Sequence, residues 1–328
     1  MIGTRTPFRV SFAGGGSDLR EFYLRSPGCV LSTAINKYMF IFIHPYFDEK
    51  IQVKYSRTEL VNEINEINHP IVREALRKFG INGIDINSIA DIPAGTGLGS
   101  SCSFTVGLLH ALYAYSYKYP TKERLAREAC EIEIDILKEP IGKQDQYAAA
   151  YGGLNFITFL PDDTVNVEPV IISPNKYHEF ENNLLFFYLG GARPARDILS
   201  DQKYNTISDK KTFSNIIRMT ELAQNLRHSL SAGNLQDVGL ILDEGWSLKK
   251  DLSSKISENK IDFYYDVAKK NGAIGGKLLG AGGGGFLMFY CEQMDQDKLR
   301  RSLNGLKEYT FKFESSGTKV IYVGENEV

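Results

Sequence analysis

A glycine-rich segment in the first half of the chain constrains its fold most strongly. The segment DIPAGTGLGSSCSF, residues 91–104, carries Gly95, Gly97 and Gly99 at alternate positions. Glycines spaced in this way let backbone N–H groups approach a ligand without a Cβ clash. An apolar helical pattern begins just after the two serines that follow. The segment therefore leads to a helix N-terminus, where unpaired N–H groups and the helix dipole favour an anion.

Taken alone, this segment has two interpretations. It is either an ordinary strand-to-helix turn with a serine cap or a loop that wraps around phosphate groups. Its G-x-G-x-G spacing differs from the dinucleotide-binding G-x-G-x-x-G, and the chain contains no G-x-x-x-x-G-K-[ST]. The H-R-D and D-F-G motifs of protein kinases are also missing from the sequence. The segment therefore matches none of these standard nucleotide-binding motifs.

Composition and charge exclude several functional classes. Hydrophobic residues make up 43% of the 328 residues and charged residues 24%, which is typical of a globular protein that forms its own core. A formal net charge of −2 gives no general attraction to nucleic acid or to an anionic membrane. Because the four cysteines are isolated and no H-E-x-x-H occurs, we expect no transition-metal site and a reducing compartment.

The N-terminal sequence predicts a cytoplasmic location. MIGTRTPFRV lacks the long apolar region of a signal peptide. The longest apolar run, YMFIFIH, is too short to cross a bilayer.

The order of elements predicts an α+β fold with two domains. Strand and helix patterns mix without the regular βαβα alternation of a doubly wound parallel sheet. The stretch 161–180, polar, proline-containing and expected to be irregular, is the expected boundary, which gives domains 1–175 and 176–328. We expect a helix after the glycine segment, strands at 8–12, 81–93, 152–160, 184–190 and 318–323, an antiparallel hairpin of 38–47 with 51–56, and further helices at 68–80, 122–138, 209–232, 234–250, 260–271 and 293–306.

Other blocks of sequence favour the phosphate-binding interpretation. TPFRVSFAGGGSDL places a cation, Arg9, on a strand that ends in three glycines, and the carboxylate of Asp18 follows. EIEIDILKEPIGKQDQYAAAYGG places Glu133 near the end of a helix and Asp145 in a later turn. A carboxylate in such a turn can be held rigidly against a substrate hydroxyl. GGKLLGAGGGGFLMF, residues 275–289, adds another glycine-rich backbone surface.

In this order, the blocks resemble the motifs of the GHMP kinases, which include galactokinase, homoserine kinase, mevalonate kinase and phosphomevalonate kinase. PFRVSFAGGGSD is similar to their first motif, P-x-R-[VI]-x-x-x-G, and PAGTGLGSSCS to the second, the phosphate loop P-x-x-x-G-L-G-S-S-[AC]. KLLGAGGGGFLMF is similar to the third. The resemblance spans nearly the whole chain. It implies a ribosomal S5 domain 2-like N-terminal domain, a ferredoxin-like C-terminal domain, and an active site in the cleft between them.

The resemblance also implies a kinase that uses ATP and Mg²⁺. Ser101 and Glu133 would hold the Mg²⁺ ion, a hard cation that takes few protein oxygens. Asp145 would accept or orient the proton of a sugar's anomeric hydroxyl, and Arg9 would pair with Asp145 and with the developing phosphoryl charge. The loop that wraps the ATP phosphates would consist of Gly95, Gly97, Leu98, Gly99, Ser100 and Ser101.

Several of these residues have purely structural alternatives. Asp145 alone could be a solvated turn carboxylate, and Arg9 a surface cation on a strand. Glu131 is a rival to Glu133, since it lies two residues away and about 200° around the same helix. Asp18 could cap the helix that begins near LREFY.

The sugar is predicted from a narrower resemblance. FAGGGSDL and GKQDQYAAAYGG are most similar to kinases of D-glycero-D-manno-heptose 7-phosphate, with fucokinase domains as neighbours. The sugar would then bind Asp18 together with Gly15 and Gly16, where galactokinases carry Glu-His. A remote phosphate requires a cation, and GGARPARDIL offers Arg193 and Arg196, of which Arg193 is the expected ligand. The alternative for Arg193 is a basic helix start on the surface.

Two rival functions stay open. One is a fucokinase- or galactokinase-like enzyme that acts on an unphosphorylated sugar. The other is a sugar-phosphate-binding regulator without catalysis, against which the intact Ser101, Glu133 and Asp145 argue. The expected partners are ATP and a sugar phosphate, not nucleic acid or a membrane, and a homo-oligomer is compatible with the sequence.

Overall fold

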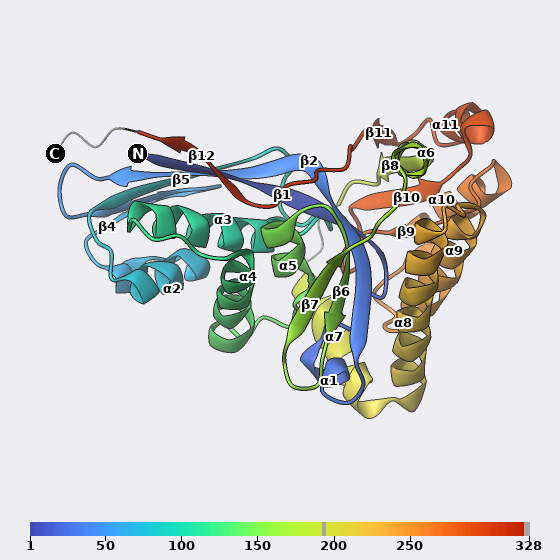
Figure 1. Ribbon diagram of the computed structural model, residues 1–328, viewed down its shortest axis with the longest axis horizontal. Helices are drawn as coiled ribbons and strands as arrows, with labels where there is room; N and C mark the ends of the chain where they lie inside the picture. The colour runs from blue at the N-terminus through green and yellow to red at the C-terminus, as the bar shows by residue number, and fades with distance from the viewer. Residues whose placement is uncertain (192–194, 325–328) are drawn as a thin grey trace.

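Two sheets organise the fold in the computed structural model, which describes residues 1–191 and 195–324 (Figure 1). The large sheet has the order β12-β1-β2-β5-β3-β4, and β6 and β7 extend it beside the first half of β2. The small sheet has the order β11-β8-β10-β9. The strands are β1 (Ile2–Ala13), β2 (Gly28–Pro45), β3 (Ile51–Lys54), β4 (Thr58–Val61), β5 (Ile84–Ala90), β6 (Leu154–Phe159), β7 (Val165–Pro169), β8 (Leu184–Tyr188), β9 (Gly275–Leu278), β10 (Phe286–Tyr290), β11 (Lys307–Tyr309) and β12 (Lys319–Val323).

Helices cover both sheets. Helices α2 to α5 gather on one side of the large sheet, while α9 and α10 pack against β9 of the small sheet (Figure 1). The helices are α1 (Arg20–Tyr23), α2 (Pro70–Phe79), α3 (Ser100–Tyr115), α4 (Lys122–Cys130), α5 (Gln144–Tyr151), α6 (Pro174–Asn182), α7 (Ala195–Ser208), α8 (Lys210–Ser231), α9 (Gln236–Lys250), α10 (Asn259–Lys270) and α11 (Gln296–Ser302), with short turns η1 (Ile64–Glu66), η2 (Glu131–Ile136) and η3 (Gln293–Asp295).

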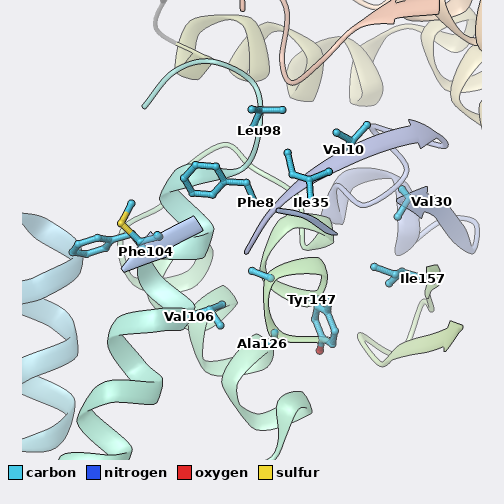
Figure 2. Close-up of a cluster of buried hydrophobic side chains, with 14 of the residues drawn as sticks. Phe8, Val10, Val30, Ile35, Leu98, Phe104, Val106, Ala126, Tyr147 and Ile157 are labelled. Carbon is cyan, nitrogen blue, oxygen red and sulfur yellow. The ribbon is translucent and has the colours of Figure 1, made fainter. Parts of the chain in front are cut away.

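The core explains why β1 carries functional side chains. Side chains alternate between the two faces of a strand. Phe8, Val10 and Phe12 enter the hydrophobic core, and burying each contributes roughly 1.5–3 kcal/mol. Figure 2 shows Phe8 and Val10 of β1 in the same buried cluster as Leu98, which precedes α3. The intervening Arg9 and Ser11 therefore face the other way, toward a cleft.

Local signals fix several helix ends. Helix α2 ends where Gly80 adopts the left-handed conformation, with φ of 65°, as the predicted stop requires. Helix α4 begins after Thr121, whose side chain accepts a hydrogen bond from the backbone N–H of Arg124. The predicted α+β class is confirmed, and so are the helix after the glycine segment and the long helices of the second half.

The predicted hairpin of 38–47 with 51–56 is wrong. Both segments contain strands, but β5 lies between them and pairs antiparallel with β2 and parallel with β3. Strand composition predicts that a strand exists, whereas its neighbour depends on which side chains pack across the sheet. Here Ile84 and Ile86 of β5 are fully buried in the core.

Two other expectations also need correction. The stretch 161–180 is not irregular, because it contains β7 and α6. Two of its three prolines mark the ends of these elements: Pro169 closes an edge strand and Pro174 is the first residue of a helix, both positions that tolerate proline. The helix predicted for 122–138 ends as an α-helix at Cys130 and continues as the π-helical turn η2.

The boundary predicted near residue 175 stays a prediction. The C-terminal strand β12 crosses back to pair with β1 in the large sheet, so that Ile2 lies opposite Val323 (Figure 1). A second hydrophobic cluster, which includes the fully buried Trp246, fills the space between the small sheet and its helices.

Candidate active site

A cleft of about 340 Å³ contains most of the residues predicted to be functional. This volume is in the range of small-molecule sites. Its walls come from β1, the glycine segment, η2, the start of α5, α7, α9 and β9. The residues used below that line it are Arg9, Gly15, Gly16, Asp18, Gly95, Gly97, Gly99, Ser100, Ser101, Glu133, Asp145, Gln202, Lys249 and Lys277.

Arg9 and Asp145 form a two-pronged ion pair in this cleft. The Nε and Nη2 atoms of Arg9 donate to Oδ1 and Oδ2 of Asp145, both at 2.6 Å. The third nitrogen, Nη1, donates to the carbonyl of Gly97 at 2.6 Å. Parallel hydrogen bonds between a guanidinium and a carboxylate are among the strongest in proteins and fix their relative orientation. Arg9 therefore ties the first turn of α5 to the glycine segment.

The glycine segment curls over the cleft as the sequence suggests. Gly95, Gly97 and Gly99 all have positive φ, at 79°, 85° and 76°. Residues other than glycine rarely adopt this backbone conformation. The last of them occupies the N-cap position of α3, so the segment ends at a helix N-terminus. Leu98 is buried, and its backbone carbonyl accepts the N–H of Arg9 at 3.0 Å.

A second glycine loop, residues 279–285, packs directly against the first. A Cβ on Gly97 would collide with the carbonyl of Leu279, and one on Gly285 would collide with that of Thr96. The two backbones therefore touch at positions where a side chain does not fit. This contact joins the glycine segment of the large sheet to the β9–β10 connection of the small sheet.

Glu133 is buried and is held in place by neutral groups. Its carboxyl accepts from the Ser101 hydroxyl at 3.0 Å and from the Gln146 amide at 2.8 Å. The side chain is 1% exposed, and burial raises its pKa, although these hydrogen bonds oppose the shift. Its rival, Glu131, points elsewhere: it pairs with Lys78 at 3.1 Å and is half exposed.

Glu133 lies within the π-helical turn η2. In η2 the backbone N–H of Leu137 bonds to the carbonyl of Ile132, five residues earlier. Single π-helical turns of this kind inside helices are frequent at functional sites. The spacing of apolar residues in the sequence did not predict this π-helical turn.

Ser101 and Glu133 fit a divalent cation. A buried carboxylate normally pairs with a cation, yet Glu133 forms no ion pair within residues 1–191 and 195–324. The Oε1 atom of Gln146 is also buried beside it without a hydrogen-bond partner in the described chain. Hard cations such as Mg²⁺ bind oxygen donors of these types and keep several waters.

Asp18 lies close to Asp145, at the start of α5. Its carboxylate accepts the backbone N–H groups of Gly16 at 3.0 Å and Gln144 at 3.3 Å. Burial, reinforced by the charge of Asp145, raises the pKa of Asp18, and the two N–H bonds oppose this shift. A Cβ on Gly142 would collide with this carboxylate, so the α5 turn and Asp18 are packed tightly. Asp18 does not cap α1, whose N-cap is Leu19.

Some cleft residues were missed by sequence reasoning. Lys249 of α9 and Lys277 of β9 are buried in its wall, and Gln202 of α7 lies over Gly16. Lys277 stands beside the third glycine motif, which could have drawn attention to it, whereas Lys249 and Gln202 lie in ordinary helical patterns. Arg193, the predicted phosphate ligand, lies outside the described residues.

Within residues 1–191 and 195–324, no helix is long and apolar enough to cross a membrane. No cluster of three His, Cys, Asp or Glu side chains suitable for a metal ion occurs in the described part of the chain.

Known proteins resemble this chain along its whole length. A D-glycero-alpha-D-manno-heptose 7-phosphate kinase of Campylobacter jejuni is 29% identical over 336 residues, covering 97% of this chain and 98% of that protein. A bifunctional fucokinase/GDP-fucose pyrophosphorylase of Arabidopsis thaliana is 29% identical over 93% of this chain but only 31% of its own length. The crystal structure of a D-glycero-D-manno-heptose 1-phosphate kinase from Bacteriodes thetaiotaomicron superimposes with a TM-score of 0.81 at 25% identity, covering 99% of this chain and 100% of that one.

Two family profiles match in the expected order. The GHMP kinases N terminal domain matches residues 62–153, and the GHMP kinases C terminal domain matches residues 222–307. Together they cover more than half of the chain and include the glycine segment, Glu133 and Asp145. With the motifs, the fold and both domains in agreement, the chain belongs to the GHMP kinases and is a phosphotransferase of their sugar-kinase group.

Proposed function

We propose that this protein transfers the γ-phosphoryl group of ATP to the anomeric hydroxyl of D-glycero-D-manno-heptose 7-phosphate, giving the 1,7-bisphosphate for nucleotide-activated heptose biosynthesis. The observation that carries the proposal is the Arg9–Asp145 pair, which lies in one cleft with the glycine segment and the Ser101–Glu133 contact. The name of the Campylobacter jejuni relative supports the choice of sugar.

Asp145 is proposed to act on the attacking hydroxyl. It accepts the proton of the anomeric hydroxyl or orients that hydroxyl toward the γ-phosphate. Both of its oxygens already bond to Arg9, so its position is fixed before substrate arrives. Arg9 also stabilises negative charge that develops on the transferred phosphoryl group. Positioning and charge neutralisation supply most of the catalysis in phosphoryl transfer.

The glycine segment is proposed to bind the ATP phosphates. GHMP kinases use ATP as the phosphate donor. The loop of Gly95, Gly97, Leu98 and Gly99 brings backbone N–H groups and the α3 N-terminus to the cleft, and Ser100 and Ser101 begin that helix.

Mg²⁺ would be held by Ser101 and Glu133. When bound there, it would neutralise charge on the ATP phosphates. Gln146 keeps the Glu133 carboxylate oriented toward Ser101 through its 2.8 Å hydrogen bond.

The sugar is proposed to lie against Gly15, Gly16 and Asp18. Gly15 has open space where a Cβ would stand, which leaves room for a ligand. The Asp18 carboxylate can accept hydrogen bonds from sugar hydroxyls. The absence of Glu-His at positions 15 and 16 argues against galactose itself. Arg193 remains the proposed ligand of the remote phosphate.

A coupled ADP-release assay tests the substrate. The panel is heptose 7-phosphate, unphosphorylated heptose, fucose, galactose and mannose, with Asp145→Asn as the inactive control. We expect turnover chiefly with heptose 7-phosphate. Turnover of neutral sugars alone would refute the proposed substrate.

Phosphorus NMR of the product then tests the position. We expect a second phosphate signal coupled to the anomeric proton, next to the original phosphate. The relatives' names place phosphate at position 7 in one case and position 1 in the other, so this measurement is decisive. A product without an anomeric phosphate would refute the proposed position.

A further inference from the structure

Two buried lysines form part of the cleft wall. Lys249 is 8% exposed and Lys277 is 6% exposed, and both line the cleft beside Arg9. Lysine is among the residues least often buried, because desolvating its charge is costly. Two such residues in one wall call for a physical explanation.

Close packing of α9 on β9 brings the two lysines together. A Cβ on Gly275 of β9 would collide with the carbonyl of Gly239 of α9, and one on Gly239 would stand 2.5 Å from Ile274. Glycine at both positions lets the helix approach the strand. Lys249 then reaches the end of β9, where its Nζ donates to the carbonyls of Leu278, at 3.2 Å, and Gly280. Lys277 donates to the carbonyl of Phe12 at 3.1 Å.

These contacts leave donor capacity unused. An ammonium group has three N–H donors. Lys249 uses two and Lys277 uses one, so three donors lack a protein hydrogen-bond acceptor among the described residues. The Lys249 ammonium also lies 5.9 Å from the centre of the Trp246 ring, a contact that leaves its third N–H without an acceptor. Neither lysine forms an ion pair there, although most buried charges do. In contrast, the neighbouring Lys250 is paired with Asp262 at 3.2 Å.

The surrounding charges do not neutralise the lysine pair. Arg9 is already paired with Asp145, and Arg196 pairs with Glu139 at 3.6 Å. Burial lowers the pKa of Lys277 to about 7, with repulsion from Arg9 adding to the shift. Burial also lowers the pKa of Lys249 well below its usual range, and Lys277 and Arg9 reinforce this. The charged groups that line the cleft are Arg9, Asp18, Glu133, Glu139, Asp145, Arg196, Lys249 and Lys277.

We propose that Lys249 and Lys277 together bind a phosphate group in the cleft. The ligand class is a phosphate dianion, either the γ-phosphate of the nucleotide or the phosphate of the acceptor sugar. The inference rests on the proposed function for the identity of these two ligands. A phosphate dianion favours the charged form of both amines, and the two ammonium groups then offer three free N–H donors in a wall that already holds Arg9, which match the acceptor oxygens and charge of such a group.

Binding measured by calorimetry distinguishes the two sources. AMPPNP is compared with ADP, and heptose 7-phosphate with unphosphorylated heptose, on wild type, Lys249→Met and Lys277→Met. We expect each variant to weaken binding of one phosphorylated ligand by roughly 10–100-fold, the effect of losing a charged hydrogen bond. A loss confined to AMPPNP assigns the γ-phosphate, and a loss confined to heptose 7-phosphate assigns the acceptor. The proposal would be overturned if a variant weakened AMPPNP and ADP equally and also weakened the two forms of heptose equally. It would also be overturned if neither variant weakened the binding of any ligand.

Proton uptake provides a readout that a structural role would not change. An anion beside Lys277 favours its charged form, so binding at about pH 8 should take up a fraction of a proton. This appears as a dependence of the binding enthalpy on the ionisation enthalpy of the buffer. We expect Lys277→Met to reduce the uptake and Lys250→Met, the matched control, to leave it unchanged. Wild type without uptake on any phosphorylated ligand would contradict the proposal even if the variants failed to fold.

Thermal unfolding separates binding from stabilisation. Replacing a buried ammonium with a methionine of similar shape should leave the melting temperature equal or higher. A lower melting temperature together with unchanged ligand affinities would assign the lysines to loop stabilisation alone. If heptose 7-phosphate neither binds nor reacts, the proposed function fails, and the comparison of AMPPNP with ADP still decides this inference.

Discussion

Arg9 and Asp145 are 136 positions apart in the chain, yet two hydrogen bonds of 2.6 Å join the guanidinium to the carboxylate. The pair spans β1 and the first turn of α5, and the remaining guanidinium nitrogen holds the glycine segment through Gly97. Three elements that meet in the cleft are thus connected through a single side chain. The position of the candidate catalytic carboxylate therefore depends on Arg9.

Arg9→Lys should lower kcat by about 100–1000-fold, the usual effect of removing a group that stabilises developing charge. Lysine keeps the positive charge but cannot bond both oxygens in parallel. KM for ATP should change less than kcat. Steady-state ADP release measures both constants. Arg5→Lys is the control, since Arg5 lies on the same strand and pairs only loosely with Glu314, at 3.7 Å. Equal effects of the two substitutions would contradict the proposed role.

Glu133→Gln should raise the Mg²⁺ concentration that gives half-maximal activity by about tenfold or more. The amide removes the charge that the cation would neutralise but keeps the shape of the side chain. Chelation of divalent cations should abolish wild-type activity and readdition should restore it. Glu131→Gln is the matched control on the same turn, because that carboxylate pairs with Lys78 outside the cleft. An unchanged Mg²⁺ requirement in Glu133→Gln would exclude this residue as a ligand.

Sequence reasoning predicted the parts of the site that lie in contiguous motifs. The glycine segment, Arg9 and Asp145 each stand in a short pattern that carries its own signal, and the structure brings them together. Helix ends were also predictable, since Gly80 and Thr121 act through residues next to them. These features depend on local backbone chemistry, which short stretches of sequence record well.

Long-range packing was not predictable in the same way. The position of β5 between β2 and β3 depends on which apolar faces meet. Lys249 becomes a cleft residue only because Gly239 and Gly275 let α9 approach β9. The π-helical turn that carries Glu133 breaks the period on which helix prediction relies. None of these three features can be predicted without the tertiary structure.

Asp18→Asn should change how stability depends on pH. The pKa of Asp18 is raised in the folded protein from its ordinary value of 3.8, so the folded state holds this proton more tightly. Its contribution to the free energy of unfolding is full below that value and is lost as pH rises through the folded pKa. Asparagine does not titrate. We therefore expect the variant to gain stability relative to wild type between about pH 4 and about pH 7.

Urea unfolding of both proteins at the two pH values measures this difference. Asp162→Asn is the control, because hydrogen bonds from Thr164 lower the pKa of that exposed carboxylate, and its shift has the opposite sign. The stability that this lowered pKa contributes is present above about pH 4 and is lost below it, so the difference between Asp162→Asn and wild type should change little between the two pH values. A pH-independent difference for Asp18→Asn would show that its carboxyl titrates alike in the folded and unfolded states.

Gly97→Ala should impair both stability and nucleotide binding. Its φ of 85° strains any other residue, and a Cβ there would collide with the backbone carbonyl of Leu279. Backbone cannot move aside as a flexible side chain can, so we expect a loss of about 1–3 kcal/mol in the free energy of unfolding and a higher KM for ATP. Gly245→Ala is the control within α9, where the added Cβ meets only Leu222 at 3.8 Å. That variant should be neutral or gain about 0.5–1 kcal/mol. If Gly97→Ala unfolds like wild type, the two glycine loops do not touch at Gly97 and Leu279.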